Sequence, residues 1–165
     1  MDTIDKVKSR NELADFLDIP RKKLSYILYI KGVDDLYTSF EIPKKSGGFR
    51  HIYAPQKDLK AIQRKLAEAL YNCQKEIWNK CNVNPNISHA FQKEKSFITN
   101  AKIHRNKRFV INIDLENFFD SFHFGRVQGY FLKNRSFQLP SEVATVIAQL
   151  TCYQGKLPQG APTSP

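Results

Sequence analysis

The stretch Arg108-Phe-Val-Ile-Asn-Ile-Asp-Leu-Glu-Asn-Phe-Phe-Asp120 decides how the rest of this sequence is interpreted. Phe109, Ile111 and Ile113 recur at every second position, which is the pattern of a β-strand with one face in the core. The alternation predicts a strand that ends at Asp114, with the Asp114 side chain on the face away from the core. We therefore expect this carboxylate on an exposed surface.

Three acids, Asp114, Glu116 and Asp120, cluster in a chain whose net charge is +10. Carboxylate oxygens are the ligands that Mg²⁺ prefers, and metal-assisted phosphoryl transfer needs such a centre. The same residues also fit a strand that is followed by a helix, with the acids exposed in the turn and in the first helical turn. This stretch alone leaves both interpretations open.

The composition indicates a polyanionic partner. Lys and Arg number 26 against 16 Asp and Glu, and aromatic residues make up 12% of the chain, which favours nucleic acid over a membrane surface. The length of 165 residues suits one domain or a piece of a larger one. Because no apolar run is long enough to span a bilayer and the N-terminus lacks the apolar core of a signal peptide, we expect a soluble, cytoplasmic protein with no membrane partner.

The cysteines and histidines give no pattern of zinc ligands. Cys73, Cys81 and Cys152 include no closely spaced pair, so we expect free thiols in a reducing compartment. The histidines are scattered along the chain, at His51, His89, His104 and His123. We assign no zinc site.

Residues 1–35 predict an accessory pair of short helices. Ser9-Arg-Asn-Glu12 has the form of a capping box that opens a helix, and Pro20 ends that helix. A second helix follows through Leu24 and Leu28. Such a pair can read DNA, although it more often only packs.

A β-hairpin is predicted after these helices. Two β-rich runs, 37–42 and 49–53, are joined by Pro43-Lys-Lys-Ser-Gly-Gly48. Adjacent glycines let backbone N–H groups approach an anion, and nearby positive charges would suit a triphosphate. An ordinary turn with solvated lysines is the alternative.

Three further helices are predicted, one after the hairpin and two after Asp120, with polar connections between them. Asp58–Trp78 has an amphipathic helical pattern and should brace the hairpin. The basic segment 96–108 suits either a solvated face or contact with a nucleic-acid backbone. Two helical patterns follow Asp120, at 127–132 and 140–150, and the Gly- and Pro-rich end at 155–165 could be a disordered tail.

Two stretches, in the same order, resemble motifs of reverse transcriptases. Phe109–Phe119 resembles the first catalytic motif of that family, and Leu157-Pro-Gln-Gly-Ala-Pro-Thr-Ser-Pro165 resembles its template- and nucleotide-binding motif. Asn100-Ala-Lys-Ile-His104 is similar to a motif of bacterial retron enzymes just before the catalytic strand. The resemblance runs from about Phe40 to Pro165.

The resemblance implies an α+β fold and a role for each matching residue. Asp114 resembles the catalytic, metal-ligating aspartate, and Leu115 resembles the neighbour whose carbonyl also reaches metal; two Mg²⁺ ions are expected in the full-length enzyme. Phe119 matches an aromatic residue beneath the incoming sugar. The other nucleotide-binding residues implied are Lys44, Lys45, Arg50 and Gln159. The RNA-binding residues expected are Asn100, His104, Arg105, Lys107 and Arg108.

The family's second metal motif, an aromatic-x-Asp-Asp turn, has no counterpart after Asp114. The expected architecture is therefore the fingers at 36–107 and a partial palm at 108–165, with palm and thumb incomplete. We expect that Asp114 faces the Lys44–Arg50 hairpin across a cleft.

For function, the resemblance implies an RNA-directed DNA polymerase of retron type that uses dNTPs. It would copy a structured noncoding RNA into RNA-linked DNA, in antiphage defence, with an effector protein as an expected partner. The 165 residues alone should be inactive. Two alternatives stay open: a basic RNA-binding module without catalysis, or a metal-dependent nuclease built on Asp114, Glu116 and Asp120.

Overall fold

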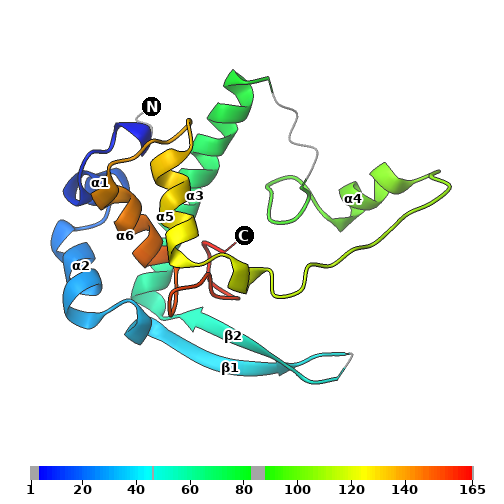
Figure 1. Cartoon of the computed structure of the whole chain (residues 1–165), viewed down its shortest axis with the longest axis horizontal. Helices are drawn as coiled ribbons and strands as arrows, with labels where there is room; N and C mark the ends of the chain where they lie inside the picture. Colours follow the sequence, from blue (N-terminus) through cyan, green and yellow to red (C-terminus); the bar gives the residue numbers. More distant parts are fainter. Residues whose placement is uncertain (1–3, 46, 83–87, 165) are drawn as a thin grey trace.

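The computed structural model describes residues 4–45, 47–82 and 88–164. Ser46 in the predicted hairpin tip, Pro165 of the Gly- and Pro-rich end and the first three residues of the N-terminal region lie outside the described residues. Within the described residues, helices α1–α6 combine with a two-stranded antiparallel sheet, which confirms the α+β class (Figure 1). No described helix is both long enough and apolar enough to cross a membrane.

The N-terminal region forms the predicted pair of short helices. A 3-10 turn at Ile4–Lys6 precedes α1, which spans Arg10–Phe16. Helix α2 spans Arg21–Ser25 and continues into a π-helical stretch at Tyr26–Lys31. Ser9 caps α1, because its hydroxyl oxygen accepts from the backbone N–H of Glu12 at 3.2 Å. The Glu12 carboxylate accepts from Lys8 N–H rather than from Ser9 N–H, so the reciprocal bond of a capping box shifts by one residue.

The predicted hairpin is confirmed. After a 3-10 turn at Asp34–Leu36, β1 (Tyr37–Pro43) pairs antiparallel with β2 (Phe49–Pro55), with Tyr37 opposite Pro55 and Pro43 opposite Phe49. The hairpin extends away from the helices as a long two-stranded ribbon (Figure 1). The helix that follows it, α3, spans Lys57–Lys80 and confirms the predicted long helix.

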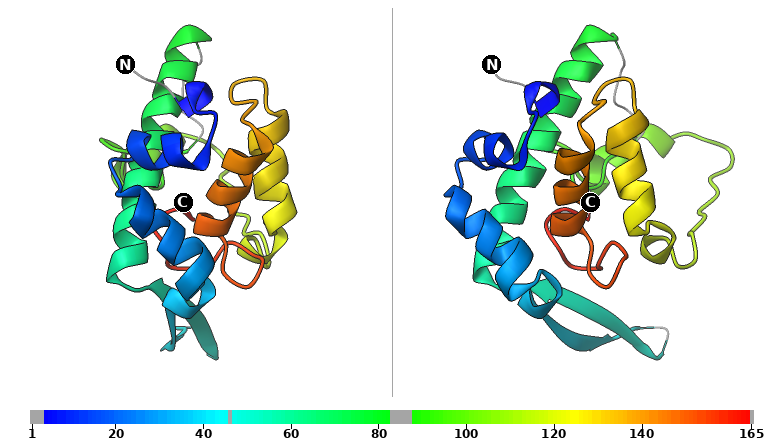
Figure 2. Two further views of the ribbon diagram at one scale, coloured as in Figure 1. Left: turned by 90° about the vertical axis from the view of Figure 1, so that its left-hand side faces the viewer. Right: turned by 60° about the vertical axis from the view of Figure 1, so that its left-hand side comes forward.

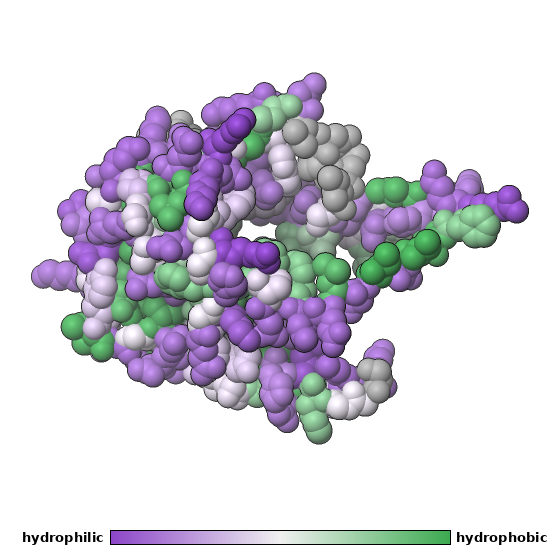
Figure 3. Space-filling view, in the orientation of Figure 1, coloured by the Kyte–Doolittle hydropathy of each residue, from purple (hydrophilic) through white to green (hydrophobic). Residues whose placement is uncertain are grey.

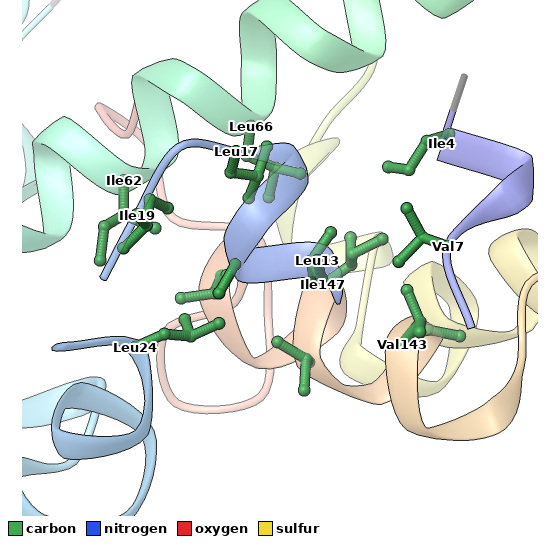
Figure 4. Packing of buried hydrophobic residues seen from close by; sticks show 14 of the residues in the cluster. Ile4, Val7, Leu13, Leu17, Ile19, Leu24, Ile62, Leu66, Val143 and Ile147 are labelled. Carbon is green, nitrogen blue, oxygen red and sulfur yellow. The ribbon is translucent and has the colours of Figure 1, made fainter. Parts of the chain in front are cut away.

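The core lies where α1, α2, α3 and α6 meet. Leu13, Leu24, Leu66 and Ile147 are almost completely buried there, and Ile4 and Val7 add apolar side chains from the N-terminus (Figure 4). Burial of each such side chain contributes roughly 1.5–3 kcal/mol, so this cluster supplies most of the driving force for folding. The N-terminal helices are thus part of the same core as the later helices.

The predicted strand at Phe109–Asp114 is wrong: residues 107–116 form neither helix nor strand. Phe109, Ile111 and Ile113 are 78%, 81% and 84% exposed, so the alternation does not bury one face. A strand needs backbone hydrogen bonds to a neighbouring strand, and β1 and β2, the strands of the described part, pair only with each other. The alternating sequence without a partner strand therefore stays extended in solvent.

Helix α4 (Phe97–His104) precedes this extended segment and was not predicted. Ser96 and Thr99 form a complete capping box, in which each side chain bonds the backbone of the other. No residue of α4 is buried. Figure 1 shows α4 and the extended segment projecting away from the other helices.

Helices α5 (Phe124–Lys133) and α6 (Ser141–Thr151) confirm the two helices predicted after Asp120. They lie side by side in both views of Figure 2, and α6 contributes most of their buried residues. A 3-10 turn at Phe119–Ser121 leads into α5. Beyond α6, residues 153–164 fold back against the hairpin and the start of α5 rather than forming a disordered tail.

Candidate nucleotide and nucleic-acid interface

The hairpin tip presents open backbone and positive charge. Gly47 and Gly48 have φ angles of 87° and 78°, and no heavy atom lies within 4 Å of a Cβ added at either. The N–H of Lys44 donates to the Gly48 carbonyl at 2.9 Å, which closes the tip. Lys44, Lys45 and Arg50 are all exposed. Their side chains are therefore accessible to an anionic ligand.

The Leu157–Ser164 segment docks onto the base of the hairpin. The backbone N–H of Tyr53 in β2 donates to the Gln159 carbonyl at 3.0 Å. At Gly160, where φ is 117°, a Cβ would lie 2.9 Å from Ile52 Cγ2 and 3.3 Å from the Tyr53 carbonyl oxygen. Only a glycine permits this approach of two backbones. Gln159 is thereby placed beside the strand that carries Arg50.

A group of tyrosines fixes the same junction. The Tyr153 ring lies 4.6 Å from the Tyr37 ring and 4.8 Å from the Tyr53 ring, centroid to centroid. The hydroxyl of Tyr37 accepts a hydrogen bond from Gln63 Nε2 at 2.7 Å. Burial raises the pKa of Tyr37 to about 12, because an ionised phenolate would lose its hydration there.

Gln63 joins the hairpin to α6 from inside the core. Its side chain is 0% exposed, and Nε2 also donates to the Leu150 carbonyl at 2.7 Å. This bond satisfies a carbonyl in the last turn of α6, where intrahelical partners run out. One buried amide thus ties β1, α3 and α6 together.

Phe119 lies on the other side of the docked segment. The N–H of Leu157 donates to the Phe122 carbonyl at 3.0 Å, and the N–H of Phe124 donates to the Gly155 carbonyl at 2.7 Å. Phe119 itself is half-buried and packs edge-on against Phe118, with centroids 5.6 Å apart. The docked segment therefore bonds both the hairpin and the turn that follows the three acids.

The three acids do not assemble into a metal site. Asp114 is exposed, as predicted, and Leu115 and Glu116 beside it are exposed as well. The Asp120 carboxylate lies 3.0 Å from Lys156 Nζ, so its charge is already paired. The part of the chain that the structure describes contains no group of three or more His, Cys, Asp or Glu side chains able to hold a metal ion. By themselves these residues do not fit a two-metal centre, which needs several carboxylates.

The predicted RNA-binding residues are all exposed, at Asn100, His104, Arg105, Lys107 and Arg108. They lie on α4 and on the segment after it, and the guanidinium of Arg108 lies 5.3 Å from the centre of the Phe109 ring. In Figure 3 hydrophobic and hydrophilic surface alternate along this projecting arm. The arm and the hairpin tip extend from the same side of the helices in Figure 1 and in the right-hand view of Figure 2.

Sequence inspection missed three residues of this interface: Gln63, Tyr153 and Gly160. Gln63 does leave a signal, since it occupies an apolar position of the α3 pattern between Leu59 and Leu66. A polar residue at a core position indicates a specific buried hydrogen bond. The contacts of Tyr153 and Gly160 depend on how the chain folds back, and no local pattern predicts them.

The sequence of this chain is similar to a known protein family and to several individual proteins. The family described as reverse transcriptase (RNA-dependent DNA polymerase) matches residues 42–165. The chain is 34% identical over 158 residues to the retron Ec86 reverse transcriptase of Escherichia coli, a match that covers 94% of this chain and 46% of that protein. It is 33% identical over 144 residues to the retron Mx65 reverse transcriptase of Myxococcus xanthus, covering 78% and 32% of the two proteins.

A third relative is the retron Se72 reverse transcriptase of Salmonella heidelberg (strain 579083-10), 32% identical over 155 residues, with 93% of this chain and 38% of that protein covered. The chain thus spans less than half the length of these relatives. The resemblance to retron enzymes drawn from the sequence motifs is confirmed.

Proposed function

Because this chain belongs to the reverse transcriptase family, we propose that it forms the fingers, at 36–107, and the first part of the palm, at 108–165, of an RNA-directed DNA polymerase. Residues 1–35 are the accessory helical pair that precedes them. One contact carries the proposal: the hydrogen bond between Tyr53 and Gln159 joins the basic hairpin to the Leu157–Ser164 segment. Two segments with proposed nucleotide contacts, far apart in sequence, thereby form one surface.

The reaction joins a primer hydroxyl to the α-phosphate of a dNTP and releases pyrophosphate. Arg50 with Lys44 or Lys45 holds the triphosphate, since exposed cations at an open glycine tip suit phosphate oxygens. Gln159 contacts the nucleotide and the template strand. Phe119 lies beneath the sugar, where its ring excludes a 2′-hydroxyl.

The metal chemistry rests on Asp114. Bound Mg²⁺ ions would activate the primer hydroxyl and stabilise the leaving pyrophosphate. Asp114 and the carbonyl of Leu115 are the groups of this chain that would hold them. Because the described residues do not group enough carboxylates for such a centre, we propose that these 165 residues alone bind RNA without polymerising DNA.

The similarity to retron reverse transcriptases supports a finer proposal. The template would be a structured noncoding RNA, the product RNA-linked DNA, and the setting antiphage defence with an associated effector protein. The RNA backbone would follow the exposed residues of the projecting arm, Asn100, His104, Arg105, Lys107 and Arg108.

RNA binding by the chain itself is the first test. A fluorescent RNA hairpin with a single-stranded overhang should bind with an affinity that falls steeply with salt, because released counterions dominate it. Replacing Lys44, Lys45 and Arg50 by Ala should reduce the slope of log Kd against log salt by up to about 3, roughly one for each phosphate that is no longer neutralised. Replacing Lys6, Lys22 and Lys31 by Ala removes the same charge from the N-terminal region and is the matched control. Equal slopes for the two triple variants would contradict the hairpin assignment.

Polymerisation is tested in a chimera. The matching part of the Escherichia coli retron Ec86 reverse transcriptase is replaced by this chain, and dNTP incorporation on an RNA template is measured with Mg²⁺. We expect incorporation that Asp114→Asn abolishes and Asp120→Asn retains, because the Asp120 carboxylate is paired with Lys156. A folded chimera that incorporates dNTPs equally well with Asn at position 114 would overturn the catalytic assignment.

A further inference from the structure

A pocket of about 850 Å³ lies apart from the hairpin, between the C-terminal half of α3, the 88–93 segment and α5. Its wall is rich in aromatic rings, contributed by Tyr71, Trp78, Phe91, Tyr130, Phe131 and Phe137. Pockets of this size are large enough for a small organic ligand or a nucleotide. None of these rings belongs to the polymerase surface proposed above, whereas Pro162 and Thr163 of the Leu157–Ser164 segment complete the wall.

The rings divide into a buried floor and an open rim. Phe131 and Phe137 are 7% and 8% exposed and pack edge-on at 5.2 Å between ring centres. Phe91 and Tyr130 are 80% and 52% exposed. Exposed rings beside a pocket offer flat faces on which a planar group can stack, while the floor keeps its shape.

The wall also carries uncharged polar groups, from Gln74, Ser88, Gln92, Asn134, Ser136 and Thr163. Side-chain amides both donate and accept hydrogen bonds, as do the edges of nucleobases. The Thr163 hydroxyl is buried and has no hydrogen-bond partner within the described part of the chain. The wall can therefore pair with a ligand that has mixed donors and acceptors.

Positive charge gathers at one side of the pocket. The Nζ atoms of Lys75 and Lys93 lie 5.3 and 5.5 Å from the centre of the Tyr71 ring. Glu68, which also lines the pocket, pairs with Lys93 at 3.6 Å and offsets its charge, so we assign the phosphate to Lys75 beside the Tyr71 ring. Stacking rings with a neighbouring cation are the features that bind single-stranded nucleic acid.

We propose that this pocket receives an unpaired base of single-stranded RNA, with the base against Tyr130 and Phe91 and its phosphate near Lys75. The inference rests on the proposed function and deepens it by adding a second RNA contact that uses neither the hairpin cations nor Asp114. An RNA strand rather than a free nucleotide is the occupant, because the chain carries a net charge of +10 and its rings lie at the open rim, where a backbone can continue past them.

The chain provides its own reporter, because Trp78 is its single tryptophan and lines the pocket. Titration with a single-stranded RNA 12-mer should quench Trp78 fluorescence to saturation, since a base that enters the pocket comes close to the indole. A duplex RNA of the same composition should quench little. Free AMP, tested alone, should need a concentration at least about 10-fold higher, because it lacks the neighbouring phosphates.

Variants then locate the contact. Tyr130→Ala should weaken binding of the single-stranded RNA by about 5- to 150-fold, the range of one stacked base. Tyr26→Ala is the matched control, because Tyr26 is also 52% exposed and lies on the N-terminal helices. Lys75→Ala, a second variant that leaves every ring in place, should weaken binding and lower its salt dependence. Circular dichroism checks the fold of each.

Three outcomes overturn the inference, and the first two are distinct from failure of the proposed function. If RNA binds but Tyr130→Ala and Lys75→Ala bind like Tyr26→Ala, the strand follows another surface. If free AMP quenches Trp78 at the same concentration as RNA, the pocket serves free nucleotides. If the wild-type chain binds no RNA at all, the proposed function fails together with this inference.

Discussion

Tyr53 and Gln159 are joined by a backbone hydrogen bond of 3.0 Å, which couples strand β2 of the hairpin to the segment that follows α6. The bond involves no side chain, so it constrains the two backbones whatever residues they carry. The sequence instead decides how closely the two backbones approach, because only the glycine at position 160 leaves room for the contact with Ile52 and Tyr53.

Gly160→Ala should lower the free energy of unfolding by about 1–3 kcal/mol, because its Cβ would overlap Ile52 Cγ2 and the backbone has a φ of 117°. Urea unfolding followed by circular dichroism measures the change. Gly129→Ala in α5, where no heavy atom lies within 4 Å of the added Cβ, should be neutral or stabilising. Equal free energies of unfolding for the two variants would show that the docked segment can move away from the added Cβ without loss of stability.

Gln63→Leu should cost about 1–3 kcal/mol of stability, because the partly buried Tyr37 hydroxyl and the buried Leu150 carbonyl both lose the donor at 2.7 Å. Gln128→Leu removes one bond, from Nε2 to Thr145 Oγ1, at a partly exposed position and should cost less. Thermal unfolding of the two variants makes the comparison. A Gln63→Leu protein as stable as wild type would mean that water or a rearranged side chain satisfies both groups.

The titration of Tyr37 should be visible at high pH. Its pKa in the folded chain is about 12, above the ordinary value of 10.0, so the folded state holds the proton that the unfolded state releases. This contribution to stability is complete below pH 10 and is lost as the pH rises towards 12. Absorbance of tyrosinate should show a late phase that is absent in Tyr37→Phe and in protein unfolded by guanidinium. A late phase that survives in Tyr37→Phe would assign it to another tyrosine.

Phe119 should control sugar choice when the chain works within a complete polymerase. Phe119→Val should raise kcat/KM for rNTPs relative to dNTPs, because loss of the ring relieves a clash that only a 2′-hydroxyl meets. The measurement is that ratio on one RNA template, with folding checked by circular dichroism.

Phe118→Val is the control for the sugar gate, since Phe118 is 42% exposed and its ring is turned 81° from that of Phe119. Its ratio should stay at the wild-type value. If Phe119 is only a core ring, Phe119→Ala should lower dNTP and rNTP use together as folded protein is lost. An unchanged ratio in a folded Phe119→Val enzyme would exclude the gate.

Local patterns predicted much of the fold, because their causes are local. The Ser9 cap, the Gly-Gly turn and the helical spacing of Leu59, Ile62 and Leu66 each act within a few residues, and the corresponding elements formed. The strand at Phe109–Asp114 failed for the opposite reason. The alternation of apolar residues predicts which face a strand would bury, but a strand also needs backbone hydrogen bonds to a neighbouring strand. The described residues do not supply that neighbour.

In the candidate site, too, features with local causes could be predicted and contacts between distant residues could not. The exposed hairpin charges at Lys44, Lys45 and Arg50 could be predicted from position alone, whereas Asp114 is exposed because its whole segment is exposed and not because it ends a strand. The bond from Tyr53 to Gln159 and the pairing of Asp120 with Lys156 arise when residues 153–164 fold back, and no window of the sequence contains both partners.

The extended segment that carries Asp114 has a consequence for the behaviour of the chain at high concentration. Its exposed apolar side chains, and a backbone that has no strand partner within the described residues, are features that let one molecule add a strand to another and start an aggregate. The net charge of +10 opposes this by repulsion between copies. Because salt screens that repulsion, the conditions that weaken RNA binding should also promote self-association, and concentrated samples should be most stable at low ionic strength.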